Sequence, residues 1–389
     1  MRFALRTKEE GCVMAELCRE FGISRKTGYK WRDRYAREGP SGLSPRSRRP
    51  KRFARVVPVP TQAALLTLRR EHPTWGARKL LVLLKRNQPD VPACSASAAQ
   101  DLFKRSGLVV PRRKRCKATP SAEPLAHCQA ANQVWCVDFK GWFRTGDGER
   151  CDPLTVTDAH SRKLLCCQAM EKKTDTPAVR SVFETLFRRY GLPEGIRSDN
   201  GTPMASAGLG GLSKLSVWWM RLGIRPERIR PGKPQENGRH ERMHRTLKND
   251  VINPPAATKR EQQAAFDRFC AEFNAVRPHE ALGMQTPDSQ YQPSPRPFPA
   301  RLTPVTYPED FETRSVRPGG KMKWKGCDVQ VTEALTGERI GLKALEKNRW
   351  EAYFMTTLLG VFDERKMRIE PMKKKAVSET RPNKGETPR

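Results

Sequence analysis

The sequence predicts a multidomain protein: α-helical modules at the N-terminal end, an α/β mixed-sheet domain in the middle, and a small all-β domain near the C-terminal end. Three observations support this. Apolar residues recur at helical spacing through about residue 110, short apolar runs bounded by turn residues begin at Ala131, and alternating runs separated by glycine follow residue 301. A chain of 389 residues is long enough for two to four domains.

Residues 1–58 are expected to form a helix-turn-helix domain. An apolar-periodic helix over Met14–Phe21 is followed by a Gly-Ile turn, and Ser24 can cap a second helix that runs to about Tyr35. Through residue 60 the segment has 16 Lys and Arg against 6 Asp and Glu, as suits a helix that enters a DNA groove. An ordinary helical hairpin with a solvated basic face is the alternative. The predicted DNA-binding residues here are Arg25, Lys26, Thr27 and Lys30.

Residues 59–112 are predicted to form a second helical, helix-turn-helix-like module. Two amphipathic runs, "TQAALLTLRREH" and "GARKLLVLLKRN", precede a third helix in "SASAAQDLFKRSGLVV". The apolar residues expected in its core are Trp75, Leu80, Leu81 and Leu84. A second DNA-binding domain and a packing module both fit this pattern. A basic linker over 113–130 follows.

Residues 131–290 carry the pattern of a mixed sheet covered by helices. The runs "QVWCVDFKGWFR", "CDPLTVTDAH" and "SRKLLCCQAM" predict an antiparallel meander. Helix "TPAVRSVFETLFRRYG", strand "GIRSDNG", helix "LSKLSVWWMRLG" and strand "IRPERIR" come next, then a helix from about Pro234 and another over Lys259–Val276.

The rest of the chain is predicted as three short segments. A Pro-rich linker spans 291–300, a small β-barrel-like domain spans 301–370, and a disordered tail spans 371–389. The β-domain prediction rests on "KMKWKGCDVQV", "ERIGLKAL", "RWEAYFM" and "LGVFDERK".

Composition narrows the class of partner. The chain has 74 Lys and Arg against 42 Asp and Glu, a net charge of +32, which favours double-stranded nucleic acid over solubility alone. No apolar run approaches the roughly 20 residues that span a bilayer, and no secretory signal is visible, so no membrane partner is expected. The 11 scattered cysteines, without a Cys-x-x-Cys pair, predict a reducing cytoplasm and no structural zinc.

Acidic residues in three contexts are candidates for a metal site. Asp138 lies inside an apolar strand, Asp199 follows another strand in "SDNG", and Glu236 and Glu241 lie near the start of a helix. Converging carboxylates repel one another unless a cation such as Mg²⁺ neutralises them. Taken singly, each acid has an ordinary explanation as a strand-edge, turn or solvated helix residue.

The order of four blocks resembles a known family. "WCVDFKGWF", "SDNGTP", "PQENGRHERMHRTLK" and "FNAVRPHEALGMQTP" resemble the catalytic core of bacterial insertion-sequence transposases of the retroviral-integrase type. The resemblance covers about residues 131–290. It implies a ribonuclease-H-like core with a DDE triad, two Mg²⁺ or Mn²⁺ ions, cleavage and joining of DNA ends, and a homo-oligomer, dimer or higher, that synapses two element ends. Element ends and target DNA are then the partners, and the location is the bacterial cytoplasm, with the nucleoid.

The choice between the two glutamates is the open point of the triad. Glu236 lies 236 − 199 = 37 residues after Asp199, close to the retroviral interval, and Glu241 lies 241 − 199 = 42 after it. On a helix the two are about 140° apart, so one site cannot use both. Glu241 falls at the edge of the helix face that the apolar pattern predicts to be buried. It is also the residue that follows the family's "PQ-x-x-G-x-x" motif. The predicted catalytic and metal-binding residues are therefore Asp138, Asp199 and Glu241.

The same alignment gives three neighbours a role at the DNA end: Asn237, Arg245 and Lys248, whose alternative is a solvated helix face. His279 is expected to be structural. The function that the resemblance implies is a DNA transposase that binds terminal inverted repeats and catalyses metal-dependent strand cleavage and transfer. Two alternatives remain: a DNA-binding regulator with an inactive core, and a structure-selective DNA nuclease with the same chemistry but no joining step.

Overall fold

The computed structural model describes residues 1–45, 57–109, 125, 127–171, 175–230 and 234–371. These fall into two compact units, Met1–Val56 and Val57–Arg389. Most of the basic linker predicted at 113–130 and all but the first residue of the tail predicted at 371–389 lie outside the described residues. Within the described ranges, no helix has the length and apolar content needed to cross a bilayer.

The first unit is a small helical bundle built on a close crossing. Helices α1 (Arg2–Arg6), α2 (Met14–Glu20) and α3 (Arg25–Glu38) precede a 3-10 turn, η1 (Gly39–Leu43). Gly28 is buried where α3 passes close to α2. A Cβ atom at this position would lie only 2.4 Å from the Cys18 sulfur, too close for any side chain to fit. The absence of a side chain at Gly28 is therefore what lets the two helices of the predicted helix-turn-helix approach.

Three helices lie within the residues predicted as the second helical module. It consists of α4 (Val59–Glu71), α5 (Ala77–Asn87) and α6 (Ala96–Arg105). Trp75, Leu80 and Leu84 are buried in its core, and Leu81 packs at its edge. Amphipathic helices of this length are stabilised mainly by this shared apolar face.

Three contacts join this module to the segment that closes the central domain. His72 lies 3.0 Å from Glu272, Arg86 donates to the Met284 carbonyl at 2.8 Å, and the Arg277 guanidinium lies 5.3 Å from the centre of the Trp75 ring. The module thus packs on the central domain as well as within itself.

The central sheet is mixed, as predicted. Its strands are β1 (Val134–Phe139), β2 (Phe143–Arg144), β3 (Arg150–Asp158), β4 (Leu164–Met170), β5 (Gly195–Ser198) and β6 (Arg225–Arg228). The strands β1, β3 and β4 form the antiparallel meander, and β5 and β6 extend the sheet parallel to β1. The short β2 pairs with the start of β3.

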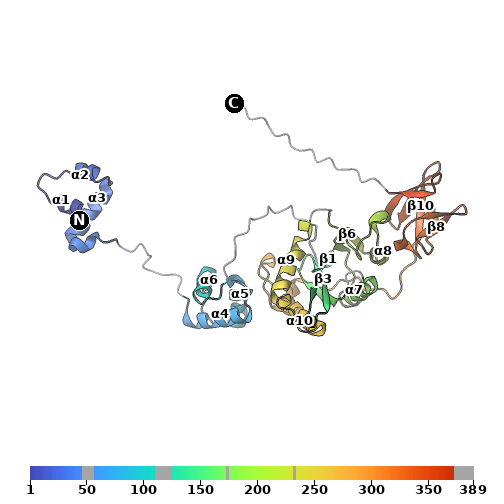
Figure 1. Ribbon diagram of the computed structural model, residues 1–389, viewed down its shortest axis with the longest axis horizontal. Helices are drawn as coiled ribbons and strands as arrows, with labels where there is room; N and C mark the ends of the chain where they lie inside the picture. The colour runs from blue at the N-terminus through green and yellow to red at the C-terminus, as the bar shows by residue number, and fades with distance from the viewer. Residues whose placement is uncertain (46–56, 110–124, 126, 172–174, 231–233, 372–389) are drawn as a thin grey trace, which may run out of the picture. The chain divides into compact units, whose positions relative to one another are not determined.

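Helices cover both faces of this sheet (Figure 1). On one face, α7 (Thr176–Tyr190) and α8 (Lys214–Arg221) pack on Trp135 and Val137 of β1. On the other face, α9 (Gly238–Leu247) and α10 (Lys259–Ala271) enclose a separate apolar cluster with β3 and β4. Side chains alternate along a strand, so Asp138, next to Val137, points to the α9 face.

Irregular turns extend several of these helices. The 3-10 turn η3 (Pro234–Asn237) precedes α9, and the π-helical turns η4 (Lys248–Ile252) and η5 (Glu272–Val276) continue α9 and α10. Other 3-10 turns are η2 (Leu209–Gly211), η6 (Glu280–Leu282), η7 (Pro287–Gln290) and η8 (Glu333–Leu335).

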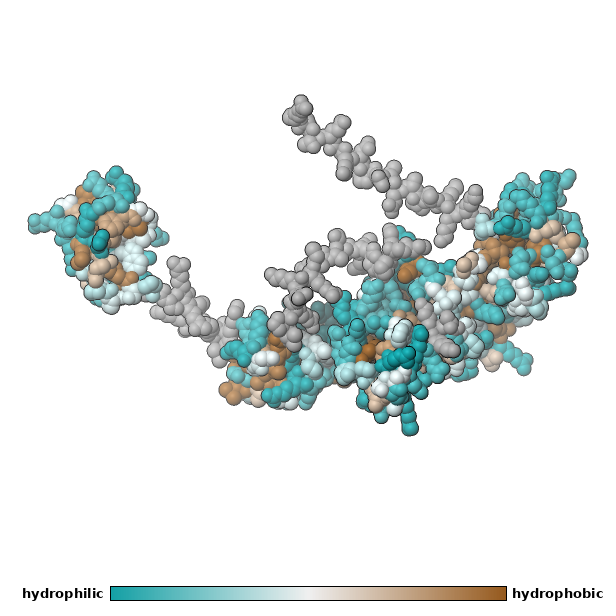
Figure 2. Space-filling model, viewed as in Figure 1, coloured by the Kyte–Doolittle hydropathy of each residue, from teal (hydrophilic) through white to brown (hydrophobic). Residues whose placement is uncertain are grey.

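The C-terminal domain is all-β and antiparallel. Its strands are β7 (Phe311–Ser315), β8 (Lys321–Trp324), β9 (Cys327–Gln330), β10 (Arg339–Glu346), β11 (Arg349–Phe354), β12 (Thr357–Asp363) and β13 (Arg368–Glu370). Five of them form a sheet in the order β13-β12-β11-β10-β7, and β8 and β9 form a hairpin. In Figure 2 the visible face of the protein is mostly hydrophilic, with apolar colour in patches.

Candidate functional site

Strand register brings two of the predicted acids together. In the parallel pair β1–β5, Cys136 lies opposite Arg197. The same register carried two residues further places Asp138 opposite Asp199, where β5 has just ended. The Asp199 carboxylate accepts a hydrogen bond from the Gly201 amide at 3.1 Å, which fixes the turn after β5. Two carboxylates on neighbouring strands therefore share one end of the sheet.

The start of α9 lies beside the first of these acids. The Asn237 side-chain amide donates to Asp138 Oδ2 at 3.4 Å, so the residue just before the helix touches the strand. Glu241 lies four residues further on, about one turn along and near the same face. It is exposed in the first turn of the helix. Helical spacing alone therefore puts Glu241 near the face of α9 that begins at Asn237.

A buried hydrogen-bond network holds α9 against the sheet. The Thr155 hydroxyl donates to the Asp138 carbonyl at 3.0 Å and lies 2.7 Å from Nε2 of both His240 and His244. The Thr157 hydroxyl lies 2.9 Å from His240 Nδ1. All these groups are satisfied if both histidines donate through Nε2 and Thr157 donates to Nδ1.

The two histidines are neutral. Burial lowers the pKa of His240 to about 3, and burial together with His240 lowers the pKa of His244 to about 2. His244 Nδ1 is 3.9 Å from Asp138 Oδ2, longer than a hydrogen bond. The pair therefore positions α9 without placing a positive charge next to Asp138.

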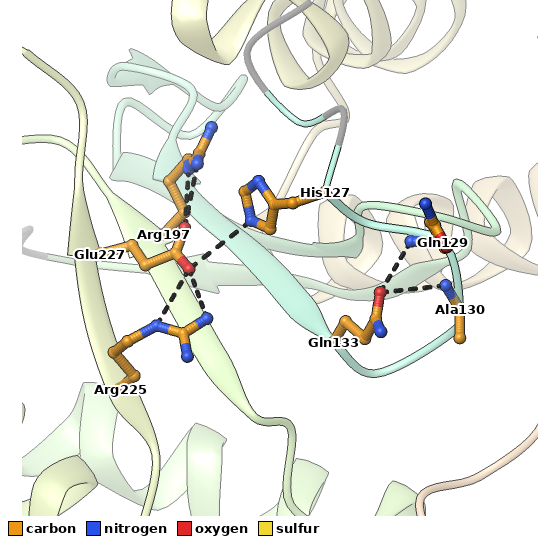
Figure 3. A network of polar contacts seen from close by, with 7 residues as sticks. All are labelled: His127, Gln129, Ala130, Gln133, Arg197, Arg225 and Glu227. Atoms are coloured by element: carbon orange, nitrogen blue, oxygen red, sulfur yellow. Dashed lines mark hydrogen bonds and ion pairs between the residues drawn. The ribbon is translucent and has the colours of Figure 1, made fainter.

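A second polar network fixes the strand that leads to Asp199 (Figure 3). Glu227 on β6 accepts from Arg197 on β5 at 3.0 Å and from Arg225 at 2.9 Å, and His127 lies 3.8 Å away. Burial alone would raise the pKa of Glu227, but the hydrogen bonds from the two arginines outweigh it and the pKa is lowered. A fully ionised Glu227 thus ties β5 to β6 two residues before Asp199.

The described residues do not form a complete metal site. Within them, no three His, Cys, Asp or Glu side chains come together in a group that could hold an ion. The strands align Asp138 with Asp199, and the Glu241 side chain would have to move towards these two carboxylates to complete a metal site. Arg245 and Lys248, on the same flank of α9, are both exposed.

Sequence profiles match four parts of the chain. Two profiles described as "Integrase core domain" match residues 129–234 and 222–287. A homeodomain-like profile matches 27–100, and the profile of the C-terminal domain of IS481 family transposases matches 311–370. The homeodomain-like match spans the boundary that the sequence predicts at residue 58.

Curated relatives agree with the profiles. The chain is 26% identical to an uncharacterised 31.7 kDa protein of insertion element IS407 from Burkholderia multivorans, over 58% of this chain and 78% of the relative. It is 25% identical to the transposase InsD of IS2 elements from Escherichia coli, over 56% of this chain and 73% of the relative. The chain is therefore similar, over separate segments, to insertion-sequence transposases that carry an integrase core. These matches confirm the predicted fold class.

Solved integrases show a weaker likeness. The integrase core is similar to the HTLV-2 integrase catalytic core domain, solved in complex with magnesium, at 16% identity and a TM-score of 0.33. That alignment covers 42% of this chain and 97% of the other. A simian T-cell lymphotropic virus intasome chain is 15% identical, with a TM-score of 0.36, over 76% of this chain and 97% of that one.

The structure gives Glu236 a different role from the one that its position in the sequence suggests. The sequence predicts a helix from about Pro234, which would place Glu236 in its first turn, but α9 begins at Gly238 and Glu236 lies in the preceding 3-10 turn. Its carboxylate is buried and accepts from the Arg230 amide at 2.9 Å and from Arg230 Nε at 2.5 Å. This ion pair holds the turn that leads into α9 and uses both oxygens of Glu236.

Helix α3, which the sequence predicts to be a recognition helix, begins at the predicted cap. The Ser24 hydroxyl accepts from the Thr27 amide at 3.2 Å and so caps α3. Arg25, Lys26 and Lys30 are exposed. The Thr27 hydroxyl lies 2.9 Å from Ser24 Oγ, so part of its bonding capacity is used inside the cap.

Several residues that shape the site gave no clear signal in the sequence. Thr155 and Thr157 look like ordinary strand residues, and His240 and His244 look like part of an apolar helix stripe. The available clue was that two histidines four residues apart face a strand that carries threonines at alternate positions. Arg230, the partner of Glu236, gave no such clue, because six residues separate the two along an irregular turn.

Proposed function

We propose that this transposase-family enzyme binds the terminal inverted repeats of an insertion sequence and catalyses metal-dependent cleavage and strand transfer of DNA. The supporting observation is the register that aligns Asp138 with Asp199, with the first turn of α9 beside Asp138. Carboxylates on two strands and one helix would form one site for phosphodiester chemistry. Glu241 is the proposed third member, because Glu236 is bound to Arg230.

The three acids fit a divalent cation of the Mg²⁺ or Mn²⁺ type. They are hard oxygen donors, and their convergence without a cation would be opposed by mutual repulsion. Asp138 and Asp199 would hold the ions from the sheet, and Glu241 would complete the site from the helix. Two such ions, when bound, favour ionisation of an attacking water or hydroxyl and stabilise the leaving oxygen.

The residues of the chain itself have two tasks in this proposal. Thr155, His240 and His244 hold α9 against β3, so that Glu241 stays within reach of Asp138. Arg245 and Lys248 lie one and two turns after Glu241 and would bind the backbone phosphates of the DNA end, while Asn237 would contact the strand near the scissile bond. The exposed cations of α3 would select the repeat sequence, and a dimer or larger homo-oligomer would bring two ends together.

The experiment that tests the proposal uses the DNA that flanks the reading frame. Duplexes taken from a pair of matched inverted repeats are incubated with the full chain, plasmid target and Mg²⁺, and cleavage and joining are followed on gels. We expect both products to form, to require Mg²⁺ or Mn²⁺, and to disappear with EDTA while the circular dichroism spectrum stays unchanged. Scrambled repeats provide the control.

Each alternative function gives a different result in the same assay. A regulator with an inactive core binds the repeats and cleaves nothing with any metal. A structure-selective nuclease cleaves but yields no joined product and does not distinguish the repeats from scrambled DNA. Unfolding on addition of EDTA would contradict the proposal that the metal binds a core that is already folded.

A further inference from the structure

A cavity of about 540 Å³ lies on the flank of α9 away from the catalytic acids. If His240 is set at 0° around the helix, Glu241 and Arg245 fall at about 100° and 140°. Arg239 falls at about −100°, on the other side of His240 from Glu241, and Arg242 falls at about −160°, about 100° from Glu241. Arg239 and Arg242 both line this cavity, together with residues from β1, the turn after β3, the segment after α10, and α5.

The cavity is rich in positive charge. Its lining contains five cationic side chains and two carboxylates: Lys79, Arg162, Arg239, Arg242 and Arg277 against Asp158 and Glu280. The Asp158 carboxylate is already occupied, because it accepts from the Asn132 amide at 2.8 Å and from the Ser161 amide and hydroxyl at 2.7 Å. One arginine, Arg277, is paired with Asp250 at 3.0 Å. The other four cations have no carboxylate within ion-pair distance among the described residues.

Arg162 is the most unusual member of this set. Its backbone has a φ of 65°, a left-handed conformation that non-glycine residues rarely adopt. Its side-chain Nε is buried and, within the described part of the chain, has no hydrogen-bond partner. Burial, with Arg239 nearby, lowers the pKa of its guanidinium to about 10. Arg162 lines the cavity, so an anion bound there would supply an acceptor to a guanidinium whose buried Nε lacks one.

We propose that this cavity binds a phosphate group of the DNA backbone, at a site distinct from the catalytic acids. Guanidinium groups from several segments that converge on one concave space match the tetrahedral oxygens of a phosphate. The proposal rests on the proposed function only in taking DNA as the ligand, and it requires neither metal nor cleavage.

The position of the cavity favours duplex DNA over a free phosphate compound. Lys79 comes from the second helical module, whereas Arg162, Arg239 and Arg242 belong to the integrase core. A DNA segment that passes from the module to the core would therefore place a phosphate at this junction. Arg86, near the end of α5, and His72, just after α4, already contact the integrase core.

The test measures metal-free binding of the full chain to a labelled duplex of arbitrary sequence, over about 50–200 mM salt. Arg242→Ala and Arg239→Ala remove cavity cations. Arg268→Ala removes the same charge from an exposed position of α10 that does not line the cavity. We expect each cavity variant to lower the slope of log affinity against log salt by about one unit, and Arg268→Ala and Arg242→Lys to keep the wild-type slope.

A titration with inorganic phosphate separates the two possible sources of the ligand. Thermal stabilisation by phosphate that is lost in Arg242→Ala, together with an unchanged DNA slope, would identify a site for free phosphate and overturn the DNA proposal. Equal slopes for Arg239→Ala, Arg242→Ala and Arg268→Ala would also overturn it. Reduced slopes in the cavity variants, together with a wild-type protein that does not cleave its repeats, would support the cavity site and contradict the proposed catalysis.

Discussion

The two helices predicted to contact DNA, α3 and α9, are held in very different ways. In α3 the buried position is Gly28, and the exposed cations Arg25 and Lys26 follow directly on the capping residue. In α9 four side chains are buried, two of them histidines that lie within hydrogen-bond distance of Thr155. Helix α3 therefore packs through a small apolar contact at Gly28, whereas hydrogen bonds hold α9 against the sheet.

This difference matches the two tasks that we assign to the helices. Recognition of base edges needs side chains that can adjust to the groove, and an exposed helix on a small domain provides them. Chemistry at a phosphodiester needs carboxylates held within a fraction of an ångström, which requires a rigid support. Substitutions in α9 should therefore act on rate and stability, and those in α3 on sequence discrimination.

The largest expected effect tests the rigid helix. Asp138→Asn, Asp199→Asn and Glu241→Gln should each lower the rate of metal-dependent cleavage by about 10³-fold or more, since losing a metal ligand removes several kcal/mol of transition-state stabilisation. Binding of the repeats should be largely unchanged. The measurement is single-turnover cleavage, with DNA affinity recorded on the same preparations.

Glu236→Gln is the matched control for Glu241→Gln. It makes the same chemical change five residues earlier, at a side chain bound to Arg230, and should retain most of the activity. An inactive Glu236→Gln together with an active Glu241→Gln would show that the turn before α9, not the helix, carries the third acid.

The support of α9 can be weakened without touching an acid. Thr155→Val removes the hydroxyl that lies 2.7 Å from both histidines, and an unsatisfied buried donor costs about 1–3 kcal/mol. We expect the free energy of unfolding to fall by at least that amount in urea titrations, whereas Thr155→Ser, which keeps the hydroxyl, should lose less. Equal stability of the Val and Ser variants would mean that the network does not hold the helix.

Much of the fold follows from local sequence. Periodicity and caps predicted helices α2 to α6, and alternation predicted the meander β1-β3-β4. The strands β7 and β13 were missed, because short edge strands with charged residues such as "FETRS" and "RIE" lack a clear alternating apolar pattern. Helix α1 was missed as well, since five residues are too few for a periodic signal.

The candidate site was predictable only in part. The order of the motif blocks selected Asp138, Asp199 and Glu241, and the strand register later placed the first two opposite each other. Contacts between segments distant in sequence could not be predicted. Thr155 and His244 are 89 residues apart, and neither segment contains a sequence pattern that identifies the other as its hydrogen-bond partner.

Sequence discrimination should depend on the exposed helix. Arg25→Ala or Lys26→Ala should reduce the preference for correct over scrambled repeats by about 1–3 kcal/mol per lost base contact. Lys30→Ala should weaken both complexes alike, because Lys30 lies further along the helix, where we expect it to contact phosphates and not base edges. Competition binding with the full chain at fixed salt measures the ratio. An unchanged ratio in both Arg25→Ala and Lys26→Ala would move repeat selection to residues 59–112.

A smaller effect is expected on the catalytic flank of α9. Arg245→Ala and Lys248→Ala should each lower the salt slope for binding cleaved repeat ends by about one unit, which is about fourfold in affinity between 50 and 200 mM salt. The rate of joining should fall with the affinity. If end binding and joining stay at wild-type levels, the two residues are solvated surface charges, and the flank has no role in holding DNA.

The smallest expected effect depends on pH and tests the cavity beside α9, which Lys79 of α5 also lines. Burial, and then Arg277, lowers the pKa of Lys79 to about 8, while Glu280 and Asp250 oppose the shift and Arg242 adds to it. Below this pKa the ammonium attracts phosphate, and above it the neutral amine does not, so the salt slope should fall by up to about one unit between about pH 7 and pH 9. Bound DNA stabilises the ammonium and moves the transition to higher pH. Lys79→Arg stays charged and should remove the change, and a wild-type slope that is flat across this range would show that Lys79 does not face DNA.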